Sequence, residues 1–229
     1  MIDPNQTIAS IVLDHSECAA VLQRHRIDYC CRGEMSLAAA CRERGLDMGE
    51  MIGKLEEAIS GRRGDDHDTR RLSSSALIAH ILLRYHAPLR DMLPFVRGLA
   101  AKVARVHGEH NPHLIELNEI VAELSDTLEA HIDDEEIRLF PTFVGGDPGR
   151  ALVGDLRKST RDEHAAVGAL LHRMRAESDD YAVPDWACTS YRALFRELER
   201  LETDVLRHVH LENHVLLPRL EGGAMRVTE

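Results

Sequence analysis

Apolar residues recur every three to four positions through most of this chain, which is the period of amphipathic helices. Beyond residue 73 the pattern runs in four long stretches that short polar segments separate, and it predicts helices over 74–106, 112–140, 151–177 and 185–218. Long helices joined by short loops are typical of an up-down-up-down four-helix bundle. Pro88 and Pro94 lie inside the first stretch, where each removes a backbone donor, so we predict a kink there.

Shorter patterns fill the first 60 residues. Thr7, Ser36 and Asp47 each precede a helical pattern and can cap it, and these patterns run over 8–23, 37–44 and 48–60. The polar, glycine-containing stretch that follows is typical of a linker. We therefore predict an all-α protein with a small N-terminal helical domain (1–60), a linker (61–72) and a four-helix bundle (73–222).

One spacing of chemically active residues occurs twice in the predicted bundle. Two histidines about 45 residues apart are followed, four residues later, by a glutamate: His86, His131 and Glu135, then His164, His208 and Glu212. Each glutamate is followed by a similar ending, Leu-Phe-Pro at 139–141 and Leu-Leu-Pro at 216–218. Two similar helical hairpins thus deliver four imidazoles and two carboxylates, which a metal pair inside a bundle would need.

The helical faces decide between a metal site and simpler readings of these residues. A single His-x3-Glu pair is typical of an exposed pair that contributes a few tenths of a kcal/mol, and a single histidine on an apolar stripe is typical of a core residue. Here all four histidines lie on apolar stripes, and two converging buried glutamates without a cation would be strongly destabilised. His210 and His214 fall on the polar face and are predicted to be solvated. His107, His110 and His113 are an alternative, weaker surface metal site.

The ligand types limit which metal ions can bind at this site. Imidazoles and carboxylates suit iron, manganese, zinc or copper. Two carboxylates shared by two ions leave an open position on each ion, which favours redox-active iron over closed tetrahedral zinc. Two ferric ions, an oxo bridge and two glutamates leave a net charge of +2, which the core can tolerate. We expect two iron ions in an oxo- and carboxylate-bridged centre, with Glu163, Asp134 and Glu136 accepting hydrogen bonds from the outer imidazole nitrogens.

Composition excludes several other classes of function. The formal net charge of −11 argues against nucleic acid as a partner. The N-terminus has neither a basic nor an apolar region of a signal peptide, and the longest apolar run, 76–83, is too short to span a membrane. Five cysteines, two of them adjacent, argue against a secreted disulfide framework and favour the cytoplasm.

Several motifs together resemble the repair-of-iron-centres family of the ScdA/YtfE type, over nearly the whole chain. They are Asp28-Tyr29-Cys30-Cys31, Arg84-Tyr85-His86, Glu163-His164, Ala187-Cys188-Thr189 and the two His-x3-Glu segments with their Leu-Phe-Pro and Leu-Leu-Pro endings. The resemblance implies a hemerythrin-like di-iron bundle behind a small cysteine-bearing domain. It also implies terminal ligands at the four histidines, bridges at Glu135 and Glu212, and a thiol pair at Cys30 and Cys31.

The resemblance further implies a cytoplasmic stress-response role, the repair of iron–sulfur clusters damaged by nitric oxide or peroxide. Our leading hypothesis is that the chain supplies iron to damaged or apo iron–sulfur proteins. The alternatives are a di-iron nitric oxide reductase, which would form N2O from NO, and a sensor or carrier of O2 or NO. Whether the chain is an enzyme, and whether it forms a homodimer, stays open.

The adjacent cysteines form a second candidate site. Cys30 and Cys31 are candidates for a redox pair, a nitric-oxide-reactive pair or a transient iron ligand. Arg24, Arg26 and Arg32 lie close in sequence, and positive charge favours the thiolate. An ordinary disulfide between neighbours is strained and easily reduced.

Overall fold

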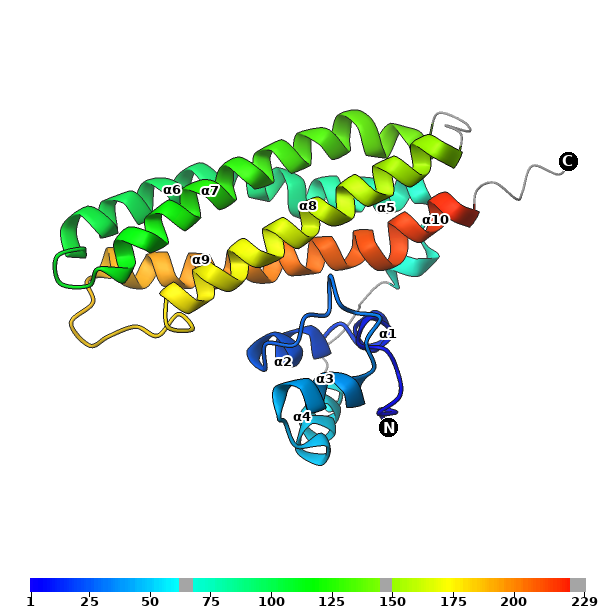
Figure 1. Ribbon diagram of the computed structural model, residues 1–229, viewed down its shortest axis with the longest axis horizontal. Coiled ribbons are helices and arrows are strands. Elements are labelled where there is room, and N and C mark those ends of the chain that lie inside the picture. Colours follow the sequence, from blue (N-terminus) through cyan, green and yellow to red (C-terminus); the bar gives the residue numbers. More distant parts are fainter. Residues whose placement is uncertain (62–67, 145–149, 223–229) are drawn as a thin grey trace, which may run out of the picture. The chain divides into compact units, whose positions relative to one another are not determined.

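The computed structural model describes residues 1–61, 68–144 and 150–222, and its regular elements in these ranges are helices (Figure 1). The short N-terminal helices are α1 Ile8–Asp14, α2 Cys18–Arg24, α3 Leu37–Arg44 and α4 Met48–Ser60. The later ones are α5 Ser74–Ile81, α6 Ala87–His107, α7 His113–Asp134, α8 Arg150–Glu177, α9 Thr189–Leu211 and α10 Leu217–Gly222. The predicted all-α class is confirmed: short helices precede four long helical runs that form a bundle.

Contacts divide the chain into two compact units. One comprises Met1–Leu77 with the segment that begins at Leu206, and the other comprises Ile78–Val205. The predicted domain boundaries at 60 and 73 stay a prediction. Most of the predicted linker, 62–67, and most of the predicted connection at 145–149 lie outside the described residues.

The three predicted caps of the N-terminal helices are present. The side chains of Thr7, Ser36 and Asp47 accept hydrogen bonds from backbone N–H groups three residues on, at 3.2, 3.2 and 2.8 Å. The prediction of one helix over 8–23 is wrong, because the chain leaves the helical region at His15 (φ −143°, ψ 83°) and starts again as α2. Apolar periodicity continues across this break, so the pattern alone does not reveal it.

A short backbone ladder fixes the segment before α3 against the start of α1. Ile8 N–H donates to Met35 O at 2.9 Å, Ala9 N–H to Gly33 O at 2.8 Å, and Leu37 N–H to Gln6 O at 3.0 Å. These bonds satisfy donors that a helix N-terminus leaves open. They also fix the position of the cysteine-bearing loop, residues 25–36, relative to α1.

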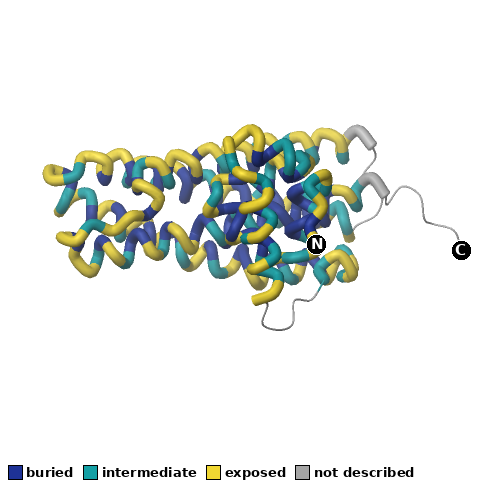
Figure 2. The backbone as a smooth tube through the Cα atoms, turned by 90° about the horizontal axis from the view of Figure 1, so that it is seen from below, coloured by how far each residue is buried: buried dark blue, intermediate teal, exposed yellow. Residues whose placement is uncertain are grey.

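Buried positions recur along the long helices (Figure 2), and many of them are apolar. Within the second unit they are Leu89, Leu93, Val96, Ala100 and Val103 on α6, Leu117, Ile120, Leu124 and Leu128 on α7, Val167, Leu171 and Met174 on α8, and Leu194, Leu198, Leu201 and Val205 on α9. Burying a side chain of this size contributes about 1.5–3 kcal/mol, so the stripe is the main source of bundle stability. In the described ranges, no helix is long and apolar enough to cross a membrane.

Within the part of the chain that the structure describes, three π turns interrupt the long helices, at Leu82–His86, Glu135–Leu139 and Glu212–Leu216. Each begins six residues before a proline: Pro88, Pro141 and Pro218. A proline has no N–H and its ring collides with the carbonyl four residues earlier, so the ordinary ladder cannot pass through it. The wider turn accommodates one extra residue in the ladder. The sequence predicts a kink at Pro88 and Pro94. The structure has the π turn Leu82–His86 just before Pro88, and α6 continues through Pro94.

Each π turn contains one of the predicted ligands. His86 ends the first turn, whereas Glu135 and Glu212 begin the second and third. Turns of this kind concentrate at functional sites, because the extra residue changes the direction in which side chains leave the helix. The prolines six residues downstream are a signal for these turns that the helical periodicity does not contain.

Candidate metal centre

Four predicted ligands lie together inside the second unit. His86 ends a π turn, His131 lies on the last turns of α7, Glu135 follows it by four residues, and His164 lies on α8. Their side chains are at most 1% exposed. Helical spacing places His131 and Glu135 on one face, and the packing of α7 against α6 and α8 brings the other two histidines to that face.

Two glutamates fix the orientation of the imidazoles. His86 Nδ1 lies 2.9 Å from Glu136 Oε1, and His131 Nδ1 lies 2.9 Å from Glu163 Oε2. Ser159 donates a further hydrogen bond to Glu163 at 2.9 Å. The bond from His131 lowers the pKa of the Glu163 carboxyl, so Glu163 is an ionised acceptor at neutral pH. The predicted roles of Glu136 and Glu163 agree with these contacts.

The prediction that Asp134 accepts a hydrogen bond from an imidazole is wrong. Asp134 accepts a hydrogen bond from Arg138 at 2.7 Å instead of contacting a histidine. Both residues lie on the outer side of the helix, and the spacing of four residues favours such an ion pair.

The outer contacts leave the inner nitrogens as acceptors. An imidazole that donates from Nδ1 presents a lone pair at Nε2. His86 Nε2 lies 3.4 Å and His131 Nε2 lies 3.5 Å from the same oxygen, Glu135 Oε2. His164 Nε2 in turn lies 3.2 Å from His131 Nε2. The Nε2 lone pairs of His86 and His131 and the Glu135 oxygen face one another in a buried place and repel, and a cation between them would turn this repulsion into coordination, so the donor set fits a metal ion.

Two groups of four residues contain all six predicted ligands. One consists of His86, Glu135, His208 and Glu212, and the other of His131, Glu135, His164 and Glu212; within each, the candidate ligand atoms lie within 4.8 Å of one another. His208 Nε2 lies 2.7 Å from Glu212 Oε1, four residues on. Both glutamates belong to both groups. Two buried His/Glu clusters that share two carboxylates are consistent with a bridged di-metal site.

The prediction that His210 and His214 are solvated is wrong. His210 is 3% exposed and donates from Nδ1 to Tyr29 O at 3.1 Å. His214 donates from Nε2 to Cys30 O at 2.9 Å. The cysteine-bearing loop covers this face of the helix, a partner that a helical wheel cannot reveal. Burial, together with His214, lowers the pKa of His210 to about 3, so His210 is neutral.

The predicted thiol pair is present, but the thiolate predicted at Cys30 is wrong. Cys30 Sγ and Cys31 Sγ lie 3.4 Å apart. The contact with Cys31, burial and the charge of Asp28 raise the pKa of the Cys30 thiol well above its usual value. Of the three arginines expected to favour a thiolate, Arg32 instead forms two hydrogen bonds to Glu43, at 2.6 and 2.9 Å.

The alternative surface site does not assemble. Of the candidate metal groups among the described residues, none includes His107, His110 or His113. His107 Nε2 lies 3.2 Å from Cys188 Sγ, and His113 Nδ1 lies 2.8 Å from Glu177 Oε2. These contacts direct the first and third histidines to different partners.

The thiols of this chain differ in accessibility, which gives a testable ranking. Cys188 is exposed, whereas Cys18 is buried and burial raises its pKa to about 12. The thiolate is the reactive form. At about pH 8 we expect Cys188 to react with an alkylating reagent well before Cys18, which should react only on unfolding. Peptide mass spectrometry of a time course measures this order, and early labelling of Cys18 in the folded protein would contradict it.

Known proteins resemble both parts of the chain. Residues 77–220 match the hemerythrin HHE cation binding domain, and residues 4–59 match the ScdA_N domain, a domain of unknown function. The chain is 31% identical over 218 residues to the iron-sulfur cluster repair protein ScdA of Staphylococcus haemolyticus, which covers 94% of this chain and 98% of that protein. The iron-sulfur cluster repair proteins YtfE of Escherichia coli O157:H7 and Dickeya chrysanthemi are 31% and 30% identical over 219 residues, covering 96% of this chain and 98% of each relative.

Proposed function

Because the chain belongs to the ScdA/YtfE family of iron–sulfur cluster repair proteins, we propose that it restores damaged iron–sulfur clusters by supplying iron. The observation that carries this proposal is the sharing of Glu135 and Glu212 by both buried ligand groups. We assign the six residues to two iron ions, with the four histidines as terminal ligands and the two glutamates as bridges. Such a pair supplies redox chemistry and positions for small ligands when it is bound.

The protein's own contribution is to orient its donors. Glu136 and Glu163 hold the outer imidazole protons of His86 and His131, so that both Nε2 atoms face Glu135. Outer contacts of this kind fix the tautomer and raise the basicity of a ligating histidine. The packed apolar side chains around the site hold these groups in place without competing ligands.

The setting we propose follows from the same assignment. The partners are damaged or apo iron–sulfur proteins in the cytoplasm, under nitrosative or oxidative stress, with NO and O2 as small ligands of the centre. Nucleic acid and membrane surfaces are not expected partners, because a net charge of −11 repels phosphate groups. Within this function Cys30 and Cys31 are the proposed redox- or NO-reactive thiols.

An isotope-transfer experiment tests the proposal. The protein is loaded with 57Fe and mixed, without free iron, with a hydratase whose [4Fe–4S] cluster has lost iron after nitric oxide treatment. We expect hydratase activity to return and 57Fe to appear in its cluster by Mössbauer spectroscopy. The Glu129→Ala variant, changed at an exposed site on α7, should transfer iron normally, whereas Glu135→Ala should not.

Other outcomes of this experiment identify the rival functions. Sustained NO consumption and N2O formation with an added electron donor, while the label stays on the protein, would overturn iron supply in favour of a nitric oxide reductase. Reversible NO or O2 binding with neither turnover nor label transfer would overturn it in favour of a sensor or carrier.

A further inference from the structure

A third group of candidate ligands lies outside the His/Glu clusters, in the loop of residues 25–36 between α2 and α3. The carboxylate of Asp28 and the sulfur atoms of Cys30 and Cys31 lie within 4.8 Å of one another. Asp28 Oδ1 is 3.2 Å from Cys30 Sγ, and the two sulfur atoms are 3.4 Å apart. A disulfide has its sulfurs about 2.05 Å apart, so the pair is a dithiol here.

Backbone hydrogen bonds hold these three side chains together. Asp28 Oδ1 accepts from Cys30 N–H at 3.1 Å and from Cys31 N–H at 2.8 Å, which fixes a tight turn across the pair. Arg26, just before this turn, adopts a positive φ of 56°. A non-glycine residue in that region costs free energy and persists where the surroundings require it. The loop therefore holds both sulfur atoms close to the carboxylate.

The helix segment that begins at Leu206 fixes the loop from the other side. Asn213 Nδ2 and His214 Nε2 both donate to Cys30 O, each at 2.9 Å. Cys30 itself is 2% exposed, whereas Cys31 is partly accessible. The backbone of Cys30 is thus anchored, and Cys31 beside it is accessible in part to solvent. Preorganised ligands of this kind lower the cost of binding.

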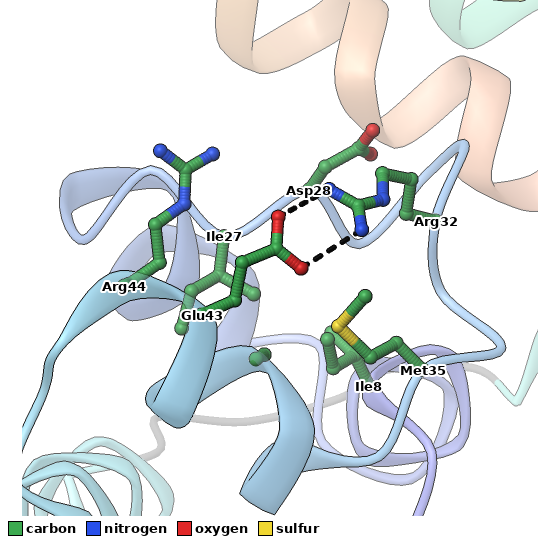
Figure 3. Close-up of a pocket in the computed structure, with 8 residues that line it drawn as sticks. Ile8, Ile27, Asp28, Arg32, Met35, Glu43 and Arg44 are labelled. Atoms are coloured by element: carbon green, nitrogen blue, oxygen red, sulfur yellow. Dashed lines mark hydrogen bonds and ion pairs between the residues drawn. The ribbon is translucent and has the colours of Figure 1, made fainter.

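Charge also favours a cation at this place. Two thiolates and one carboxylate would bring three negative charges together, and a divalent cation among them would offset this charge. Arg32 hydrogen-bonds to Glu43 across the neighbouring pocket, where Figure 3 shows both contacts, and it acts on Asp28 only through a weaker long-range attraction. Asp28 lines the same pocket. A divalent cation would replace the thiol protons, which would pass to solvent.

We propose that Asp28, Cys30 and Cys31 form a mononuclear site for one thiophilic divalent cation. Tetrahedral coordination with metal–sulfur bonds of about 2.3 Å needs sulfurs about 3.8 Å apart, only slightly more than the observed 3.4 Å. Two thiolates select zinc- or iron-like ions over magnesium or calcium. Water completes the coordination on the accessible side. The site is chemically distinct from the His/Glu clusters, which contain no sulfur.

Cadmium is the sharpest probe, because its bonds to thiolate give an ultraviolet charge-transfer band that imidazole and carboxylate ligands do not give. The titration uses the phosphine-reduced Cys188→Ser protein with two equivalents of iron per chain, which is enough to fill only the His/Glu clusters, and the exposed thiol is absent. We expect one Cd2+ per chain with the thiolate band. Cys30→Ser and Cys31→Ser should weaken binding more than about 100-fold and Asp28→Asn about 10- to 100-fold.

Matched controls use the buried cysteines of the same unit. Cys18→Ser and Cys41→Ser make the same chemical change at positions outside the group and should leave the band unchanged. Circular dichroism confirms that each variant keeps its helices. No band at one equivalent of Cd2+, or a band that survives in the Cys30→Ser/Cys31→Ser double variant, would overturn the proposal. The iron-transfer test depends on the His and Glu ligands, whereas the Cd2+ titration depends on Asp28, Cys30 and Cys31. Either test can therefore fail without the other.

Discussion

In the Cys30→Ser/Cys31→Ser background, which lacks the proposed thiolate site, Glu135→Ala is expected to lower the metal content of the protein from two ions per chain to near zero. Glu135 belongs to both ligand groups, and its Oε2 atom lies 3.4 and 3.5 Å from the inner nitrogens of His86 and His131. One substitution therefore removes a ligand from both ions. Loss of an outer partner alone costs about 10- to 100-fold in affinity, so loss of a shared ligand should exceed about 100-fold. Metal analysis after anaerobic loading and desalting measures the effect.

Two other glutamates make this prediction specific. Glu129 is exposed on the same helix, and Glu129→Ala should retain both ions. Glu136→Ala removes the outer acceptor of His86 but no metal ligand, so it should weaken binding by an intermediate factor of about 10- to 100-fold. Two ions per chain in Glu135→Ala, or equal losses in Glu129→Ala, would contradict the assignment of Glu135 as a shared ligand.

Thermal unfolding gives an independent view of the same change. A ligand that binds only the folded state stabilises it by about 2.7 kcal/mol when present at 100 times its dissociation constant. Ferrous iron added under argon should therefore raise the midpoint of the native protein and of Glu129→Ala. It should not raise that of Glu135→Ala, whatever the stability of that variant without metal.

The sequence predicts the bundle and the convergence of the six His and Glu residues for one reason. The 3.6-residue period states which side of each helix faces the core, and residues on core-facing stripes of a four-helix bundle must meet. His131 and Glu135 illustrate this, since their spacing and apolar neighbours suffice to place them inward. The same period cannot show a π turn, because the extra residue leaves the apolar pattern almost unchanged. The prolines at 88, 141 and 218 carry that information.

The features that the sequence does not predict depend on contacts between distant segments. His210 lies on the polar side of its helix, yet it is buried. The backbone carbonyl of Tyr29, 181 positions earlier, accepts a hydrogen bond from its ring. Cys30 has neighbouring arginines in sequence, yet its thiol is protonated because Cys31, burial and Asp28 outweigh them. In both cases contacts made in the folded chain determine the burial and protonation state of the residue, and the local sequence does not reveal these contacts.

Gly33→Ala is expected to destabilise the cysteine-bearing loop strongly. A Cβ at this position would lie 2.6 Å from Tyr29 O, 2.7 Å from Ala9 Cβ and 2.7 Å from His214 Nε2. Two of these atoms cannot swing away, because Tyr29 O is backbone and Ala9 Cβ is fixed to α1. Gly33 O also accepts from Ala9 N–H at 2.8 Å, so the loop cannot retreat without losing that bond. Overpacking of this kind costs about 1–3 kcal/mol or more.

Gly53→Ala is the matched control, because a Cβ there meets nothing within 4 Å and the residue lies inside α4. Alanine in a helix is favoured over glycine by about 0.5–1 kcal/mol, so this variant should be stabilised. Urea unfolding of the metal-free proteins gives the two changes with opposite signs, and Cys30 should become accessible to alkylation only in Gly33→Ala. Equal stabilities of the two variants would mean that Tyr29, Ala9 and His214 do not enclose Gly33 in solution. The loop would then be held less tightly than its hydrogen bonds to Asn213 and His214 require.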